Sequence, residues 1–399
     1  MKSKFPGYFK LTKEEINQLW KTALFTFDAN ILLNLYRYSD ETREEFYKIL
    51  EKIKDRIWIP HQSAQEFFNN RLAVIGQQEK SYEEAISAIN TLESEFKNSR
   101  QHPFINSRLL KKFSNLSKDI CEQLNENKQF HNKRIQQDDI LEKIEKLFND
   151  KVGEEYNSER IEQLYREGDT RFSNKVPPGY KDSNKKDDVG RNGRQYGDLV
   201  VWKQTIEKSK ESKNAIILIT DDRKEDWWVR FNGKTIGPRP ELIKEFKDET
   251  SKSFHMYQSD RFLEFAREYL NETINEKAIE EIRELRRLDE KRRLSEIRRE
   301  QEKSKYLDDK ESLFKDSQLL EEELKYLEES KIELYGRIEV EKNKLDNSDP
   351  SAFDTSQMEK LQKVLLNTER HIMHILVKRD ELRERYKSMQ SRLSRRKLL

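Results

Sequence analysis

The sequence predicts an α/β domain built on a parallel sheet, followed by a region of long helices. Residues 25–27 and 215–220 are short, continuous apolar runs of the kind that form buried strands. A third run, residues 56–60, ends at a proline, which cannot continue a strand. Helix-compatible segments separate the three runs, and this alternation is typical of a parallel sheet. Beyond residue 271 the composition changes to dense Arg and Glu, which predicts exposed, salt-bridged helices.

The first domain is expected to span residues 1–270 and to open with a helix over residues 13–20, capped by Thr12. A second, amphipathic helix starts near residue 40. Residues 79–170 are polar, helical in pattern and too long for an ordinary connection in an α/β domain, so they are expected to form a helical insertion. Its basic and aromatic residues fit a lid or a substrate-binding arm. Its mixed charge also fits a solvated helix hairpin.

The remaining elements of this domain follow from the same periodicities. In order, they are a helix over residues 197–206, a loop over 233–240, a helix over 241–246, a short edge strand over 253–257 and a final helix that begins at 259. The domain is therefore expected to close near Leu270.

The second domain, residues 271–399, is expected to be entirely helical. Apolar residues recur at alternating steps of three and four from Leu320 to Leu345, and the same seam resumes from Met358 to Leu393. The turn formers between them, which include Pro350, favour an antiparallel coiled-coil hairpin. A narrow apolar seam needs a cover. The cover can come from the same chain, from a second copy in a homodimer or higher oligomer, or from a partner protein.

Composition narrows the class of protein. Of the 399 residues, 34% are hydrophobic and 39% charged, and the net charge is only +2, so nucleic-acid binding would depend on a local basic patch. The single cysteine, Cys121, excludes a disulfide framework and a multi-cysteine zinc site and fits a reducing compartment. No stretch has the apolar length of a signal peptide or a membrane span. A cytoplasmic protein without a membrane partner is expected.

Acidic residues follow the strands or begin helices at several separate places. Asp28 comes directly after the first strand, and Asp221 and Asp222 follow the second apolar run. Glu66 and Asp198 lie near the starts of two helices. Because the carboxyl ends of parallel strands meet at one edge of a sheet, these acids are expected to converge there and to form a site for a hard cation. An aspartate at a strand end is also a common helix cap, so Asp28 alone decides nothing.

Several blocks in the first two thirds of the chain resemble a known family. They are Phe27-Asp28-Ala29-Asn30, Glu66 after Trp58-Ile59-Pro60, and residues 177–182, 196–203, 220–228 and 237–242. In this order they resemble the PIN-like nucleases, and within them the bacterial PIN-like domains with a long helical insertion. The resemblance implies a PIN-like parallel-sheet fold and a nuclease that hydrolyses phosphodiester bonds with Mg²⁺ or Mn²⁺, supplied as paired ions.

Carried over residue by residue, the resemblance assigns roles to individual side chains. The acids expected to be catalytic and to bind metal are Asp28, Glu66, Asp198 and Asp222. Two neighbouring acids are further candidate ligands, Asp221 and Asp226. The side chains expected to contact or orient substrate are Asn30, Thr220, Arg223, Lys224, Lys185 and Lys186. The last two lie in a Gly- and Lys-rich loop that either holds a nucleic-acid backbone or is a linker with incidental charge.

Other catalytic schemes fit less well. The sequence has no phosphate-cradling loop that ends in Lys-Ser or Lys-Thr and no serine elbow, and its six histidines show no convincing ligand spacing in the nuclease region. Two functions therefore stay open. The first is an endoribonuclease, with RNA favoured over DNA as substrate and a toxin-like or antiphage defence role. The alternative is a catalytically weak PIN-like scaffold that binds nucleic acid and assembles partners through its coiled coil.

Overall fold

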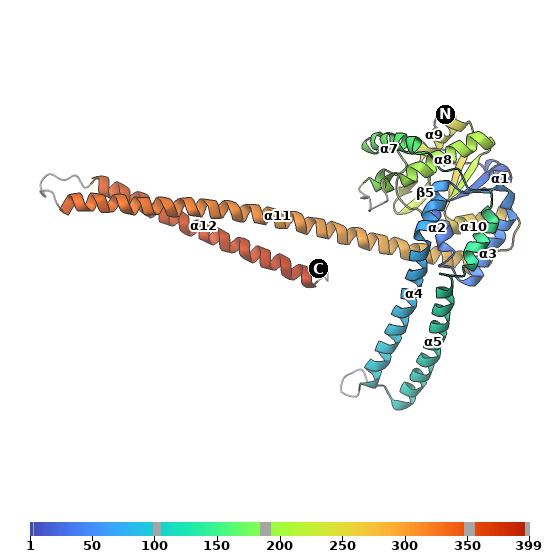
Figure 1. Cartoon of the computed structure of the whole chain (residues 1–399), viewed down its shortest axis with the longest axis horizontal. Helices are drawn as coiled ribbons and strands as arrows, with labels where there is room; N and C mark the ends of the chain where they lie inside the picture. The colour runs from blue at the N-terminus through green and yellow to red at the C-terminus, as the bar shows by residue number, and fades with distance from the viewer. Residues whose placement is uncertain (3, 99–104, 184–192, 347–355, 396–399) are drawn as a thin grey trace. The chain divides into compact units, whose positions relative to one another are not determined.

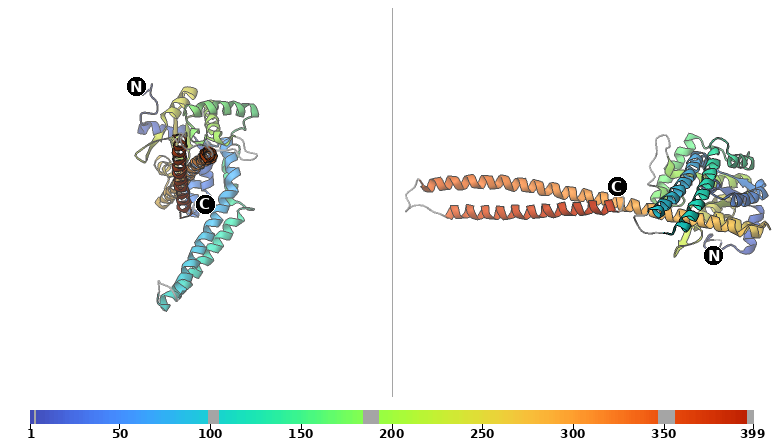
Figure 2. Two further views of the ribbon diagram at one scale, coloured as in Figure 1. Left: turned by 90° about the vertical axis from the view of Figure 1, so that its left-hand side faces the viewer. Right: turned by 90° about the horizontal axis from the view of Figure 1, so that it is seen from below.

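The computed structural model describes the chain except for residues 3, 99–104, 184–192, 347–355 and 396–399. The chain divides into two compact units, Met1–Arg286 and Arg287–Leu399. Figure 1 follows the elements along the chain, and Figure 2 gives two further views. Within the described ranges, none of the helices combines the length and the apolar character that crossing a bilayer requires.

The elements of the first unit alternate between helices and strands. Its helices are α1 (Lys13–Thr22), α2 (Ala29–Asn34), α3 (Asp40–Lys52), α4 (His61–Lys97), α5 (Ser107–Lys133), α6 (Asp139–Phe148), α7 (Ser158–Ser173), α8 (Gly197–Ser212), α9 (Pro240–Thr250) and α10 (Ser259–Tyr269). Its strands are β1 (Leu24–Phe27), β2 (Ile57–Trp58), β3 (Ile216–Ile219), β4 (Trp228–Phe231), β5 (Lys234–Pro238) and β6 (Phe254–Tyr257). Short 3₁₀ turns are η1 (Lys54–Arg56), η2 (Tyr180–Asp182) and η3 (Arg194–Tyr196).

A four-stranded parallel sheet forms the centre of this unit, in the order β2-β1-β3-β6. In the central pair, Leu24 lies opposite Ile216 and Phe27 opposite Ile219. The backbone N–H of Asp28 extends the ladder to the Ile219 carbonyl at 3.0 Å. The parallel sheet predicted from the sequence is confirmed. Its register brings the residues that follow β1 and β3 side by side.

Helices cover both faces of the sheet, because alternate strand residues point to opposite sides. On one face, Phe25, Phe27 and Ile217 join a core with α1, α2, α3, α6 and α10. On the other face, Leu218 and Met256 pack with α8 and α9. With both faces buried, the ends of the strands are where polar groups can reach solvent.

The predicted loop over residues 233–240 is wrong, because part of it is a strand. β4 and β5 form an antiparallel hairpin whose two-residue turn is Asn232-Gly233. Both turn residues have positive φ, at 48° and 76°, which is the conformation that matches the twist of a hairpin. The Asn-Gly pair between apolar residues was a signal for this hairpin in the sequence.

The helical insertion begins with the same helix that carries Glu66. α4 runs without interruption from His61 to Lys97, and α5 packs alongside it as the other arm of a helix pair (Figure 1). Residues Arg100 and Phe104 of the region between the arms lie outside the described residues. The inner end of α4 is therefore part of the sheet domain, while its outer end belongs to the insertion.

The first unit extends past Leu270, where the sequence predicted it to close, and includes the start of α11 (Glu276–Asp346). Ile274, Ile279 and Ile282 are buried in the same core as the sheet residues. The side chain of Glu281 also accepts a hydrogen bond from Thr42, at the start of α3, at 2.6 Å. These widely spaced apolar residues therefore pack the start of α11 against the core of the first unit, so this part of the helix is not free in solvent.

The second unit consists of the rest of α11 and α12 (Ser356–Arg395). The two helices pack antiparallel, as predicted (Figure 2). Lys331 lies 3.0 Å from Glu369, which also accepts a bond from the Tyr335 hydroxyl at 3.0 Å. Ile375 is buried. The predicted turn at Pro350 lies outside the described residues, and association with a second copy or a partner protein stays a prediction.

We expect Ile279→Ala to lower the free energy of unfolding of the first unit by about 2–4 kcal/mol, because it removes a fully buried side chain and leaves a cavity. All five tryptophans lie in this unit, so urea unfolding followed by tryptophan fluorescence reports on it alone. Leu294→Ala, on an exposed part of the same helix in the second unit, is the control and should change this free energy by less than about 0.5 kcal/mol. Equal effects of the two variants would contradict the boundary at Arg286.

Candidate active site

Asp28 lies directly after β1 and at the start of α2, where aspartates commonly cap helices. Its side chain makes no capping bond. Instead, its Oδ2 atom accepts a hydrogen bond from the Thr220 hydroxyl at 2.7 Å and another from the Asn30 amide. The carboxylate therefore faces the neighbouring strand end, not its own helix.

Asn30 and Thr220 join the ends of β1 and β3. The side-chain oxygen of Asn30 accepts from the backbone N–H of Asp221 at 3.0 Å, and Thr220 Oγ1 accepts from the backbone N–H of Asp222 at 3.0 Å. The Asn30 amide also donates to Thr220 Oγ1 at 3.2 Å. Both residues were predicted near substrate. In the structure they hold Asp28 against the segment that carries Asp222.

Negative charge accumulates around the Asp28 carboxyl. Burial raises its pKa, and the nearby carboxylate of Glu66 raises it further. The Thr220 hydrogen bond acts in the opposite direction, and Asp198 and Asp222 add to the rise, so that the pKa reaches about 7. A shift of this kind, caused first by burial and then by neighbouring acids, is common at functional sites.

Glu66 and Asp198 meet where α4 and α8 approach each other. Glu66 lies in the second turn of α4, and its Oε1 atom accepts from the Gln62 amide at 2.8 Å. Gly197 begins α8, and a Cβ atom at this position would lie 2.8 Å from Glu66 Oε1. The absence of a side chain at residue 197 thus lets the first turn of α8, with Asp198, lie against Glu66.

Lys224 was predicted to contact phosphate, and its ammonium points at carboxylates. Nζ lies 2.8 Å from an Oδ2 atom of each of Asp182, Asp198 and Asp222. Burial lowers the pKa of this lysine, but the three carboxylates outweigh burial and raise it overall. Lys224 is therefore a firmly charged cation inside the acidic cluster.

Asp182 is a member of the cluster that the sequence reasoning missed. It ends η2, and its position depends on the buried side chain of Asp226, whose Oδ2 atom accepts from the backbone N–H groups of Gly179 at 3.0 Å and Lys181 at 3.1 Å. Gly179 has φ of 95°, which favours glycine. The only sequence signal for Asp182 was its place at the end of a block that resembles the family.

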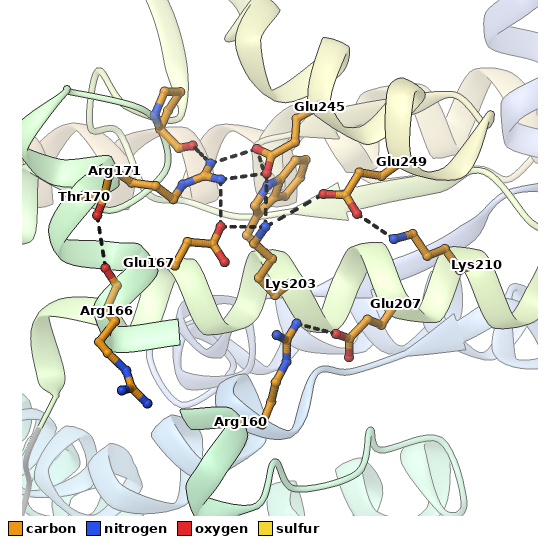
Figure 3. A network of polar contacts seen from close by, with 12 residues as sticks. Arg160, Arg166, Glu167, Thr170, Arg171, Lys203, Glu207, Lys210, Glu245 and Glu249 are labelled. Carbon is orange, nitrogen blue, oxygen red and sulfur yellow. Dashed lines mark hydrogen bonds and ion pairs between the residues drawn. The ribbon is translucent and has the colours of Figure 1, made fainter. Parts of the chain in front are cut away.

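A network of ion pairs ties the same segment to α7, α8 and α9 (Figure 3). Arg171 on α7 binds Glu245 on α9 through two N–H groups, at 2.7 and 2.8 Å, and also donates to the Pro177 carbonyl. Lys203 on α8 lies 2.8 Å from Glu167 and 3.3 Å from Glu245. Paired, two-point contacts of arginine fix geometry as well as charge, so this network holds the chain that leads to Asp182.

The family model for PIN-like domains matches residues 24–242. The chain belongs to this family. PIN-like domains are generally nucleases that act with divalent metal ions, and the matched range runs from β1 to the start of α9. No curated protein and no solved structure matches the chain.

Two acids of the PIN-like domain that were candidate metal ligands have other partners. Asp221 accepts hydrogen bonds from the Ser259 hydroxyl at 2.7 and 2.8 Å and from Asn34 at 3.0 Å, and it lies 3.1 Å from Arg286. Asp226 binds the backbone of the segment described above, and burial raises its pKa to about 6. Both acids are thus placed to hold the segments that carry Asp222 and Asp182.

The structure gives less information about the basic residues that were predicted to contact substrate. Arg223 is partly exposed next to Asp222. Lys185 and Lys186 lie outside the described residues, so their predicted contact with substrate is not addressed by the structure. Trp227 and Trp228 are both buried, and Trp228 donates to the Asp222 carbonyl at 2.6 Å. The two rings therefore pack beneath the surface next to the segment that carries Asp222, and they offer no exposed face on which a nucleic-acid base could stack.

The donor set of the PIN-like site suits a hard cation. Its acidic side chains offer carboxylate oxygens, which Mg²⁺ and Mn²⁺ prefer, and the pKa of Asp28 is raised by burial and by the acids near it. Among the described residues, no group of three or more Asp, Glu, His or Cys side chains is arranged to hold a metal as it stands. Lys224 contributes to this, because its ammonium already lies between three of the carboxylates.

We expect the stability of the chain to depend on pH through Asp28. Its pKa is raised from 3.8 to about 7 in the folded chain, so the folded state binds the proton more tightly than the unfolded state. Without metal, stability should therefore fall as the pH rises from about 4 to about 7. Asp28→Asn removes this loss and should stabilise the chain by about 1–3 kcal/mol at pH 8, with little effect at pH 4.

The measurement is urea unfolding in a chelator across this pH range. Asp55→Asn, which changes an exposed acid outside the cluster, is the matched control and should not alter the pH dependence. A stability difference between wild type and Asp28→Asn that is the same at pH 4 and pH 8 would contradict the assignment of charge repulsion to Asp28.

Proposed function

We propose that the protein is a Mg²⁺- or Mn²⁺-dependent nuclease, with RNA as its favoured substrate and internal cleavage as its mode of action. The observation that carries the proposal is that three acids from separate elements, Glu66, Asp198 and Asp222, lie near enough to the Asp28 carboxyl to add to the effect of burial and raise its pKa to about 7. Membership of the PIN-like family supports it. A toxin-like or antiphage role is a narrower claim, and its support is the resemblance to the family.

The four acids need a cation before they can act on nucleic acid. A phosphodiester carries a negative charge, and the acidic cluster repels it at short range. A divalent ion, when bound, would supply the positive charge that neutralises the phosphate. Asp28, Glu66, Asp198 and Asp222 would hold the ion, while Thr220 and Asn30 keep Asp28 in place.

The remaining polar contacts keep this arrangement rigid. The turn held by Asp226 and the ion pairs of Arg171 fix the approach of Asp182. The backbone N–H of Lys224 holds Asp222 through a bond of 2.7 Å to Oδ1. These bonds limit the positions of the acids before the ion arrives, and the carboxylates then have to turn toward it, because in the part of the chain that the structure describes they do not form a metal-binding group as they stand.

We expect purified protein to cut labelled single-stranded RNA with Mn²⁺ or Mg²⁺ and to lose cutting in a chelator. Asp28→Asn and Asp198→Asn should each lower the cleavage rate by more than about 100-fold, because each removes a ligand of the ion. Single-stranded DNA and duplex DNA are assayed beside RNA to define the substrate. Glu225→Gln is the control. Glu225 lies on the loop that carries Asp222 and pairs with Lys181, and the variant should cut normally.

Undiminished cleavage by both aspartate variants would refute the assignment of the site. Absence of cleavage with any substrate and either metal would favour the alternative, a PIN-like scaffold that binds nucleic acid and assembles partners through α11 and α12.

We expect Gly197→Ala to separate activity from stability. The new Cβ would lie 2.8 Å from Glu66 Oε1, so this carboxylate must shift and the cleavage rate should fall by at least about 10-fold. The fold should be unharmed or gain up to about 1 kcal/mol, because alanine favours a helix more than glycine does.

Gly76→Ala is the matched control for this substitution. It makes the same change within α4, where a Cβ meets nothing within 4 Å, and should keep full activity. A Gly197→Ala variant that cuts as well as wild type would show that the close approach of α8 to Glu66 has no role in the reaction.

A further inference from the structure

The contacts of Lys224 resemble those of a bound cation more than those of a surface lysine. Its ammonium has three protons, and three carboxylate oxygens from three separate segments lie at 2.8 Å each. The segments are η2, the first turn of α8 and the chain after β3. The side chain is only 21% exposed, so the ammonium occupies the space between the three carboxylates and is not a mobile surface group.

The Asp28 side of the cluster differs from the Lys224 side. The bonds to Asp28 come from neutral donors, the Asn30 amide and the Thr220 hydroxyl. The Lys224 side is bonded by a charged ammonium, whereas the two side-chain donors to Asp28 are neutral. The contacts therefore place a cation on one side of the cluster and neutral donors around the carboxylate on the other.

Asp198 and Asp222 are shared between the two sides. Each binds the Lys224 ammonium through an Oδ2 atom. Asp222 is also tied to Asp28 through the Thr220 hydroxyl, which accepts from the backbone N–H of Asp222 and donates to Asp28. A carboxylate has two oxygens and about four acceptor positions. An acid can therefore face the ammonium with one oxygen and a metal ion with the other.

A second lysine in the same domain shows that such contacts alone do not leave a site for metal. Lys203 lies 2.8, 3.3 and 3.8 Å from Glu167, Glu245 and Glu249. Other cations share these glutamates, since Arg171 binds Glu245 and Lys210 binds Glu249 (Figure 3). Several cations share the charge there, whereas the Lys224 ammonium bonds to three aspartates at once.

We propose that the Lys224 ammonium is a built-in second cation of the PIN-like site, so that the site takes one divalent ion and not a pair. The single ion binds on the side of Asp28 and Glu66, and the lysine holds Asp182, Asp198 and Asp222 on the other side. The inference rests on the proposed metal-dependent nuclease and replaces the paired ions expected from the sequence.

The test counts Mn²⁺ ions bound to the full chain, by isothermal titration calorimetry and by electron paramagnetic resonance of the unbound ion. Wild type should bind one ion at the site. Lys224→Met, which keeps the length of the side chain and removes its charge, should bind two. Lys224→Arg should bind one, because the charge is kept. The double variant Lys224→Met with Asp182→Asn should return to one, because the new site loses a ligand.

Lys203→Met is the matched control. It also removes a lysine that lies among three carboxylates, but Arg171 and Lys210 remain beside them, so it should bind one ion, as wild type does. Thermal melts accompany every variant. If Lys224→Met does not fold, Lys224→Gln takes its place, and the count for wild type still decides.

The outcomes separate this inference from the proposed function. Two ions on wild type would overturn the built-in cation and leave the nuclease proposal intact. One ion on both wild type and folded Lys224→Met would also overturn it. No bound ion on either protein would overturn both the inference and the metal dependence of the proposed nuclease.

Discussion

Carboxylates gathered at one edge of the sheet repel one another, and the other contacts of the site compensate for this repulsion. The parallel register of β1 and β3 places Asp28 beside the segment of Asp222, and α4 and α8 add Glu66 and Asp198. Such a group cannot be assembled from ionised side chains without compensation. The compensation takes three forms. The pKa of Asp28 is raised to about 7, which favours its protonated form, neutral groups donate hydrogen bonds to it, and Lys224 contributes a charged ammonium.

The polar contacts around the cluster can be understood as a response to this repulsion. A carboxylate that is repelled by its neighbours turns away to solvent unless its backbone and side chain are held. The buried Asp226 holds the turn before Asp182, and the ion pairs of Arg171 and Glu245 hold the helices on either side of it. Buried, hydrogen-bonded ion pairs of this kind contribute little net stability. Their effect in this fold is to limit the positions that the acids can take.

Periodicity and chain order were enough to predict the sheet, its buried strands and the proximity of Glu66, Asp198 and Asp222 to Asp28, because these features depend on local pattern and on the common direction of parallel strands. Asp182 could not be predicted in the same way. It comes from an irregular segment whose path is set by Asp226 and Arg171, residues that no periodicity connects to it. The β4–β5 hairpin differs from Asp182, because its Asn-Gly turn is a local signal that the sequence contains and that predicts a hairpin in place of the loop.

Lys224 shows why charge alone is a poor guide to what a side chain contacts. As a lysine close to an acid that was predicted to be catalytic, it was expected to bind phosphate, as a cation on an exposed loop can. Its actual partners depend on where α8 and η2 bring Asp198 and Asp182. That information is three-dimensional, and it changes the chemistry of the site, because an ammonium bonded to three carboxylates is no longer a free contact for substrate.

The adjacent acids Asp221 and Asp222 give a last constraint on the site. Asp222 is held by the Lys224 ammonium, whereas Asp221 is held by Ser259 at the start of α10 and by Arg286 on α11. The segment after β3 is thus fixed from two sides. Arg286 is also the last residue of the first compact unit. The opening turns of α11 therefore help to hold the segment of the acidic cluster, and a domain that ended at residue 270 would keep the bond from Ser259 to Asp221 but lose the ion pair with Arg286.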